Sequence, residues 1–325
     1  MSAGPVLVTG AAGFVGVHVA LRLLERGETV IGVDDFNAYY DPSLKDLRAA
    51  RLQAHPGFRM VRGDIAEPDL IAGIVRSEGV RRVVHLAAQA GVRYSLENPF
   101  AYQRSNLQGH LAVLEACRHG GVEHLVYASS SSVYGDRPLT GQGFREEDAA
   151  VTPVSLYAAT KRSCELLSQS YASLYGFPQS GLRFFTVYGP MGRPDMAYFG
   201  FTEAIMAGRP IEVFGQGRMA RDFTYIDDIV DGVIGVLDRP PAQGGHEIYN
   251  IGDSHPVGLM DMIATLERLL GREAVKVMRP MQPGDVTATY ADVTRLNALT
   301  GYAPKVELAE GLDRFVRWWR DWRGV

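Results

Sequence analysis

Hydrophobic residues in the first half of the chain fall into short continuous runs separated by helical patterns. Apolar runs rich in Val, Ile and Leu predict strands at residues 5–8, 29–33, 59–62, 82–86, 125–128 and 180–184. Because most of these runs are continuously apolar rather than alternating, we expect strands covered on both faces, as in a parallel sheet. Between them, helices are predicted near residues 15–26, 71–78, 99–120 and 156–175. This alternation is typical of βαβ units.

The pattern becomes irregular after about residue 185, where Gly, Pro and Met gather in two clusters. One more strand–helix unit is predicted near residues 222–237, followed by a strand at 247–251 and a helix at 260–270. The aromatic, basic end of the chain contains Trp318, Trp319 and Trp322, which we interpret as core packing of a last helix.

These elements predict an α/β fold with two parts. The first, residues 1–185, is a doubly wound parallel sheet of the Rossmann type, to which residues 222–251 return. The second, residues 186–325, is a smaller, mostly helical substrate domain. Since no low-complexity linker separates them, we expect the two parts to pack against each other around a cleft.

A glycine-rich loop follows the first predicted strand directly. Gly10, Gly13 and Gly16 form a Gly-x-x-Gly-x-x-Gly pattern, and a helix comes next. Glycine permits a tight turn, lets the backbone approach a pyrophosphate and lets helix and strand pack closely. The N-terminus of the helix offers free N–H groups to phosphates. The loop therefore indicates a dinucleotide site.

Asp34 supports this interpretation, because it ends the second strand about twenty residues further on. A carboxylate there can accept hydrogen bonds from the ribose hydroxyls of NAD, and it repels the 2′-phosphate of NADP. The alternative is that Asp34 and Asp35 only terminate a strand. Because the glycine loop and Asp34 both indicate a dinucleotide site, we favour NAD as the cofactor.

The catalytic candidates are Tyr157 and Lys161, four residues apart and therefore on one face of a helix. A nearby ammonium and a bound nicotinamide cation both favour the phenolate form of a tyrosine and would lower its pKa. Residues 129–132 are four serines at the end of the fifth strand, where a hydroxyl would complete the set. The Tyr-x-x-x-Lys pair alone occurs by chance on many helices, but here it accompanies a nucleotide loop.

Composition excludes several other classes of function. The formal net charge is -4, so no general affinity for nucleic acid or anionic membranes is expected. No apolar run reaches the roughly 18 residues that span a bilayer, and we see no signal peptide. The two cysteines, Cys117 and Cys164, have no metal-ligand spacing, so we expect reduced thiols, no metal and a cytoplasmic protein.

Several motifs resemble the extended short-chain dehydrogenase/reductases that act on nucleotide sugars, and the resemblance covers nearly the whole chain. It rests on the glycine loop, Asp34, Leu86-Ala87-Ala88, residues 129–135, Tyr157 with Lys161, Arg183-Phe184-Phe185-Thr186 and Arg221-Asp222-Phe223. Within that group, residues 182–190 and the continuation Gly192-Arg193-Pro194-Asp195-Met196-Ala197 are most similar to bacterial UDP-glucuronate 4-epimerases.

The resemblance implies a chemistry and a set of residues. Tyr157 would take the proton of the sugar 4-hydroxyl while NAD takes hydride from C4, with Ser130 bonded to that oxygen and Lys161 on the nicotinamide ribose. The 4-keto sugar would then turn over, and hydride would return to its other face. The predicted cofactor-binding residues are Gly10, Gly13, Phe14, Val15, Gly16, Asp34, Asn37, Asp64, Ile65, Leu86, Ala87, Ala88, Asn106, Tyr157 and Lys161. The predicted substrate-binding residues are Arg93, Ser130, Ser131, Ser132, Thr186, Arg193, Arg221 and Asp285.

Comparison with related activities narrows the substrate to a UDP-uronate. The dehydratases of this group carry Asp-Glu where this chain has Ser131 and Ser132, and the decarboxylases that make UDP-xylose carry Glu at the second of these positions. UDP-galactose 4-epimerases usually carry Asn in place of Thr186 and Arg in place of Gln282. The resemblance also implies a homodimer through helices 99–120 and 156–175.

Two possible roles remain for each of two arginines, Arg193 and Arg221. Arg193 is expected to bind the substrate carboxylate, since a planar guanidinium binds carboxylates through two hydrogen bonds; otherwise it is a solvated charge in a Gly/Pro loop. Arg221 resembles the arginine that holds the substrate diphosphate; otherwise it forms a salt bridge with Asp222 or Asp227. The expected function is interconversion of UDP-glucuronate and UDP-galacturonate. The rivals are a UDP-glucose/UDP-galactose 4-epimerase, a UDP-glucuronate decarboxylase and a non-catalytic NAD-binding regulator.

Overall fold

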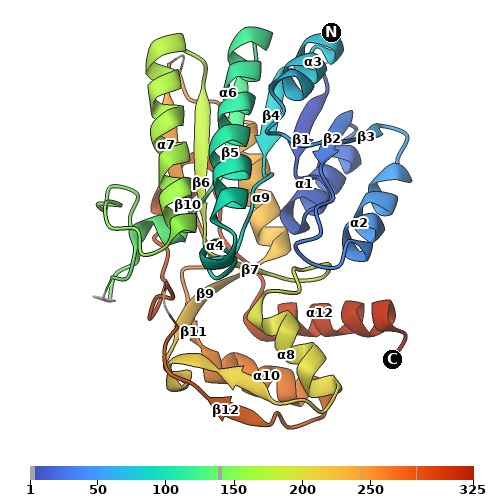
Figure 1. The fold of residues 1–325 in the computed structure, drawn as a ribbon, viewed down its shortest axis with the longest axis vertical. Coiled ribbons are helices and arrows are strands. Elements are labelled where there is room, and N and C mark those ends of the chain that lie inside the picture. Colours follow the sequence, from blue (N-terminus) through green and yellow to red (C-terminus); the bar gives the residue numbers. More distant parts are fainter. Residues whose placement is uncertain (1–3, 138–140, 243, 283) are drawn as a thin grey trace.

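Seven parallel strands form the central sheet of the molecule (Figure 1). This computed structural model describes residues 4–137, 141–242, 244–282 and 284–325. The sheet has the order β10-β6-β5-β4-β1-β2-β3, so the strand order reverses between β1 and β4. Its strands are β1 (Val6–Thr9), β2 (Val30–Asp34), β3 (Phe58–Arg62), β4 (Arg82–His85), β5 (His124–Ser130), β6 (Gln179–Phe184) and β10 (His246–Ile251).

Helices cover both faces of this sheet. On one face lie α3 (Pro68–Glu78), α6 (Gly109–Gly120) and α7 (Leu156–Tyr175), whose apolar side chains form one core with the strands. On the other face α1 (Phe14–Glu25) packs against α9 (Ile226–Leu237). Because both faces are covered, β1, β2 and most of the other strands are buried along their length, as the continuous apolar runs predict.

The second part contains two small sheets and three larger helices (Figure 1). β7 (Thr186–Tyr188), β9 (Ala220–Tyr225) and β11 (Pro256–Gly258) form one sheet, while β8 (Ile211–Val213) pairs with β12 (Lys276–Met278). The helices are α8 (Ala197–Met206), α10 (Leu259–Leu270) and α12 (Leu308–Arg323). The first part also contains α2 (Ser43–Gln53). The remaining short elements are α4 (Tyr94–Glu97), α5 (Pro99–Tyr102), a π-helical turn η1 (Gln103–Gln108), the 3-10 turns η2 (Ser131–Tyr134) and η3 (Phe214–Gly217), and α11 (Thr294–Thr300).

One hydrophobic core runs through both parts. It joins side chains of α1 and α9 to those of α8, α10 and α12, among them Phe199, Phe315 and Trp319. Trp318 and Trp322 stack on each other with their ring centroids 5.4 Å apart, and both pack edge-on against Phe199. The tryptophans therefore serve core packing, as their sequence suggested. Within the described residues, no helix is both long enough and apolar enough to cross a membrane.

The structure corrects three details of the expected fold. The single helix expected over residues 99–120 is α5, the π turn η1 and α6 in succession. The strand expected near residue 222 is β9, which pairs with β7 and β11 instead of joining the central sheet. By contrast, α9 packs on the central sheet and β10 joins it. Helix α2, like α8, has no counterpart among the predicted elements. For α2 the reason is that its inward face includes the charged side chains of Lys45 and Arg48.

The reversal of strand order brings the glycine loop against the end of β4. A Cβ atom at Gly10, whose φ is +70°, would lie 2.8 Å from the backbone nitrogen of Ala87. A Cβ at Gly16 would lie only 1.9 Å from the carbonyl oxygen of Gly10. Neither obstacle can move, since both belong to backbone. The turn from β1 into α1 therefore requires glycine at these positions.

We expect Gly16→Ala to lower the free energy of unfolding by about 2 kcal/mol or more, because backbone must shift to admit the methyl group. The control is Gly73→Ala in α3, where the added Cβ would meet nothing within 4 Å. An exposed helical glycine replaced by alanine should gain about 0.5–1 kcal/mol. Urea unfolding followed by circular dichroism measures both. Equal effects of the two substitutions would contradict the close packing at Gly16.

Candidate active site

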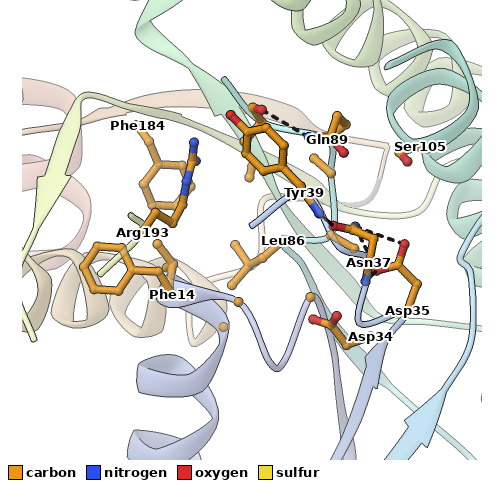
Figure 2. A pocket seen from close by; sticks show the side chains of 18 of the residues that line it. Phe14, Asp34, Asp35, Asn37, Tyr39, Leu86, Gln89, Ser105, Phe184 and Arg193 are labelled. Atoms are coloured by element: carbon orange, nitrogen blue, oxygen red, sulfur yellow. Dashed lines mark hydrogen bonds between the residues drawn. The ribbon is translucent and has the colours of Figure 1, made fainter. Parts of the chain in front are cut away.

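A cleft with a cavity volume of about 250 Å³ opens at the carboxyl ends of the central strands. Figure 2 shows Asp34, Asp35 and Asn37 at one end of it and Arg193 with Phe184 at the other, with Leu86 between them. This is the place where ligands bind in doubly wound folds, because the strand order reverses there and leaves a crevice.

Asp34 is a buried carboxylate held in a fixed orientation at the end of β2. It accepts hydrogen bonds from the backbone N–H groups of Ala12 at 3.1 Å and Phe36 at 2.9 Å. The ammonium of Lys45, which is also buried, lies 3.5 Å from it and 3.7 Å from Asp35. Sequence reasoning missed Lys45, because a lysine in a polar segment carries no signal that it points inward.

Two further strand ends complete this wall of the cleft. Asp64, after β3, accepts hydrogen bonds from the N–H of Ala66 and from the guanidinium of Arg104, both at 2.8 Å. After β4, the N–H of Ala87 donates to the hydroxyl of Thr9, which fixes the small residues of this turn against β1. A glycine cradle without room for Cβ atoms, an oriented carboxylate and small residues at the opposite strand end together fit a dinucleotide.

Tyr157 and Lys161 line the cleft from the first turns of α7. The hydroxyl of Ser155 caps this helix by accepting a hydrogen bond from the N–H of Ala158 at 3.1 Å. The ammonium of Lys161 is buried and donates to the carbonyl of Ala128, in β5, at 2.9 Å. Lys161 thus meets the end of β5, where the serines begin, and Tyr157 lines the same cleft.

The structure separates the two serines at the end of β5. The hydroxyl of Ser129 donates to the buried carboxylate of Glu165 at 2.6 Å. Glu165 also receives two hydrogen bonds from Arg183, both at 2.9 Å. Burial alone would raise the pKa of Glu165, but the bonds from Arg183 and Ser129 hold it below its usual value. Both serines line the cleft, but the hydroxyl of Ser130 does not bond Glu165; its oxygen caps η2 by accepting from the N–H of Ser132 at 3.2 Å.

Asn106 lies behind the cleft wall, in the π turn η1. Its side chain bonds both the N–H and the carbonyl of Gln89, at 2.8 and 3.1 Å, and donates to the hydroxyl of Thr160 at 3.0 Å. Gln89 lines the cleft and Thr160 precedes Lys161, so Asn106 ties the wall to the catalytic helix. Direct contact between Asn106 and a cofactor stays a prediction.

At the other end of the cleft, Arg193 is engaged by an internal carboxylate. Asp195 accepts its Nε and Nη2 groups at 3.0 and 2.5 Å. Asp195 also accepts the hydroxyl of Tyr39 at 3.1 Å. Although burial raises the pKa of Asp195, the Arg193 guanidinium outweighs this and holds it below its usual value. Arg193 is thus a half-buried, paired charge that lines the cleft.

A second cluster of charges lies beyond the cavity. Arg93 pairs with Asp285 at 3.3 Å. Arg221 donates to the carbonyl groups of Val286 and Thr287 at 2.8 and 3.3 Å, and among the described residues it makes no salt bridge with Asp222 or Asp227. Asp222 is instead buried and accepts the N–H groups of residues 253, 254 and 291. The interdomain salt bridge considered for Arg221 is therefore wrong.

Most predicted cofactor residues line the cleft, whereas most predicted substrate residues do not. Those that line it are Gly10, Gly13, Phe14, Val15, Gly16, Asp34, Asn37, Asp64, Ile65, Leu86, Ala87, Ala88, Ser130, Tyr157, Lys161 and Arg193. Ser131 and Ser132 form the start of η2 beside Ser130, and Thr186 lies between two lining residues, Phe185 and Val187. Arg93, Arg221 and Asp285 form the outer cluster, which would meet a longer substrate. The roles of all these residues stay predictions.

Residues 6–252 match the model of the NAD dependent epimerase/dehydratase family. The chain belongs to this family. A Rhizobium meliloti protein named as a probable UDP-glucuronate 4-epimerase is 46% identical, over 96% of each chain. The crystal structure of the Bacillus cereus UDP-glucuronic acid 4-epimerase, in complex with UDP-glucuronic acid and NAD, is 34% identical with a TM-score of 0.91, over 98% of this chain and 99% of that one. A Thermotoga maritima UDP-glucose 4-epimerase with UDP-glucose is 29% identical, with a TM-score of 0.89 over 98% and 99%.

Membership of the family and the cradle at the carboxyl edge agree on the cofactor, which is NAD. The glycine loop and Asp34 are the residues that would hold it. Within the described residues, no group of three or more His, Cys, Asp or Glu side chains could hold a metal ion. Cys117 and Cys164 are free and buried, and burial raises the pKa of Cys164 to about 11, so this thiol stays protonated near neutral pH.

The contrast between the two serines gives a prediction about stability. Ser129→Ala should lower the free energy of unfolding by about 1.5–3 kcal/mol, because Glu165 loses a hydrogen bond to a charged group in a buried site. Ser131→Ala, at a partly exposed hydroxyl beside it, should leave stability within about 0.5 kcal/mol of wild type. Thermal unfolding by calorimetry compares the two. A Ser129→Ala variant as stable as wild type would contradict the role of this network.

Proposed function

We propose that this protein interconverts UDP-glucuronate and UDP-galacturonate by oxidation and re-reduction at C4. One observation carries the proposal: the cleft holds Tyr157, Lys161 and Ser130 together with Arg193, a cation suited to a carboxylate. The family, the relatives named above and the missing acid residues at Ser131 and Ser132 support the same substrate.

In the proposed reaction the chain supplies proton transfer and orientation. Tyr157 takes the proton of the 4-hydroxyl as general base and returns it at the end, and Lys161 would hold the nicotinamide ribose. Ser130 hydrogen-bonds the same oxygen. Bound NAD supplies the hydride acceptor and donor. Since oxidation and reduction cancel, the reaction needs no second substrate.

The carboxylate of the substrate needs control, because a 4-keto uronate is a β-keto acid that loses CO2 readily. Arg193, the serines of η2 and Thr186 would keep this carboxylate in polar contact. No glutamate or aspartate stands at Ser131 or Ser132. Because dehydratases and decarboxylases of this group carry acids there, epimerisation is favoured over elimination and decarboxylation.

A UDP-glucose/UDP-galactose 4-epimerase is the second candidate, favoured by the structural likeness to the Thermotoga maritima enzyme. Thr186 and Gln282 argue against it, because they depart from the residues that the UDP-galactose epimerases usually carry. Arg193 adds a cation to the cleft, although in this structure it already pairs with Asp195.

Incubation of purified protein with UDP-glucuronate and catalytic NAD, followed by proton NMR, tests the proposal. UDP-galacturonate should accumulate to a fixed ratio without pentose or CO2. Conversion of UDP-glucose or UDP-galactose while UDP-glucuronate stays unchanged would refute the uronate assignment. Release of a UDP-pentose would reveal a decarboxylase.

The control for this reaction is Tyr157→Phe. Removal of the general base should lower kcat by about 100-fold or more, while the NAD content and the unfolding temperature stay near those of wild type. If the protein only bound NAD without catalysing a reaction, wild type and Tyr157→Phe would behave alike in every assay.

We also propose a cytoplasmic homodimer that associates through the outer faces of α6 and α7, which lie side by side (Figure 1). Leu111 on α6 is 40% exposed, and Leu166 and Leu174 on α7 are 56% and 67% exposed. Large apolar side chains gathered on neighbouring helices are typical of a protein interface.

Leu166→Glu should convert the dimer to a monomer, since it places a charge in a buried apolar contact. Val275→Glu is the matched control, because Val275 is 61% exposed and lies next to β12, far from these helices in the fold. Size-exclusion chromatography with light scattering measures the mass. If wild type elutes as a monomer, or if Leu166→Glu stays dimeric, this interface is wrong.

A further inference from the structure

Arg48 is a fully buried arginine on the inward face of α2, with 0% of its surface exposed. All five of its N–H groups donate hydrogen bonds. Nε and Nη2 donate to the carbonyl of Met191 at 3.0 and 2.7 Å, and Nη2 also donates to the carbonyl of Gly192 at 2.8 Å. Nη1 donates to the carbonyl of Ala12 at 3.2 Å and to the hydroxyl of Tyr40 at 2.6 Å. Among the described residues, Arg48 forms no salt bridge, and the nearby carboxylates of Asp34 and Asp35 pair with Lys45.

A buried charge without an ionic partner is costly unless its hydrogen bonds are satisfied. Here oxygen dipoles from three separate segments satisfy it: the glycine loop, the segment after β2 and the loop after β7. The planar five-donor fork of arginine can reach all of them at once, whereas the three donors of lysine cannot. The position of Arg48 therefore depends on these segments, and their relative placement depends on Arg48.

The loop after β7 needs such support, because its backbone is strained. Met191 has a φ of +55°, which a side chain with a Cβ rarely adopts. Arg48 bonds its carbonyl oxygen twice. The next residue must be glycine, since a Cβ at Gly192 would lie 1.8 Å from the hydroxyl of Tyr198. Arg193 follows directly, so the direction of its side chain is set by this held backbone.

The other side of Arg48 reaches the cofactor loop. The backbone of Ala12 is fixed on both sides of its Cα: its N–H donates to Asp34 and its carbonyl accepts from Arg48. A second tie runs in parallel, because Tyr39 bonds Asp195, the partner of Arg193, while the adjacent Tyr40 bonds Arg48. The glycine loop and the Arg193 loop are thus held in one frame.

We propose that Arg48 is a positioning residue that orients Arg193 toward the substrate carboxylate by clamping the Met191–Gly192 backbone to the glycine loop. Arg48 does not line the cleft and touches neither ligand in this role. It acts through Arg193. The inference rests on the proposed function, since it needs Arg193 to bind a carboxylate.

The test is a double-mutant cycle between Arg48→Lys and Arg193→Met. Arg48→Lys should raise the KM for UDP-glucuronate about tenfold or more, because a misplaced binding group loses much of its effect, and it should release more UDP-pentose by NMR. In the Arg193→Met background, Arg48→Lys should change KM by less than about twofold, since groups that act as one unit are not additive. The control Arg51→Lys, on the same helix at an exposed arginine 3.8 Å from the sulfur of Met191, should match wild type.

The outcomes separate the two hypotheses. If wild type leaves UDP-glucuronate unconverted, the proposed function fails and the Arg48 proposal fails with it. If wild type is active but Arg48→Lys behaves like wild type, or the two substitutions add, only the Arg48 proposal fails. Should Arg48→Lys not fold, Tyr40→Phe removes one acceptor and keeps the charge. Tyr40→Phe should raise the KM for UDP-glucuronate when Arg193 is present but not in the Arg193→Met variant. Equal effects of Tyr40→Phe on KM in both backgrounds would overturn the proposal.

Discussion

The close approach of two strand ends is the constraint on which the site depends. The sheet reverses its order between β1 and β4, and the backbone of Gly10 lies so near Ala87 that a single Cβ would collide with the main chain. This approach puts the β2 and β3 ends, with Asp34 and Asp64, on one side of the crevice. It puts the β5 end and α7, with the catalytic candidates, on the other. Recognition of the cofactor and chemistry thus occupy opposite halves of one sheet edge.

The second part completes the cleft through packing rather than through a flexible connection. Its core is continuous with that of α1 and α9, and a buried carboxylate, Asp222, joins its loops. Burial raises the pKa of Asp222, although three backbone N–H groups and the hydroxyl of Thr224 oppose this shift. The neighbouring Arg221 is carried on the same strand and is held by carbonyls of residues 286 and 287. The hydrogen bonds of Asp222 and Arg221 to neighbouring backbone groups therefore join the loops of the second part and also hold the outer charge cluster in place.

The sequence allowed prediction wherever a residue type and its spacing determine direction. Continuous apolar runs predicted the strands of the sheet to within two residues at either end, and helix 156–175 agrees with α7. Tyr157 and Lys161 were recognisable because a spacing of four residues puts both on one helix face. Ser129 and Ser130 could not be told apart in this way. Neighbours on a strand point to opposite faces, but the alternation does not say which face carries Glu165.

Two of the residues that escaped prediction are charged side chains that point inward. Lys45 and Arg48 lie on the buried face of α2, where a hydrophobicity pattern counts them as solvent-facing, so neither the helix nor its role was found. Both belong to the short stretch that links Asp34 to the Arg193 loop. The ties join protein groups to protein groups: Asp34 holds the N–H of Ala12, and Arg48 joins the carbonyl of Ala12 to those of Met191 and Gly192. The placement of the Arg193 loop relative to the glycine loop is therefore a property of the fold itself, set by buried charged side chains that a hydrophobicity pattern cannot find.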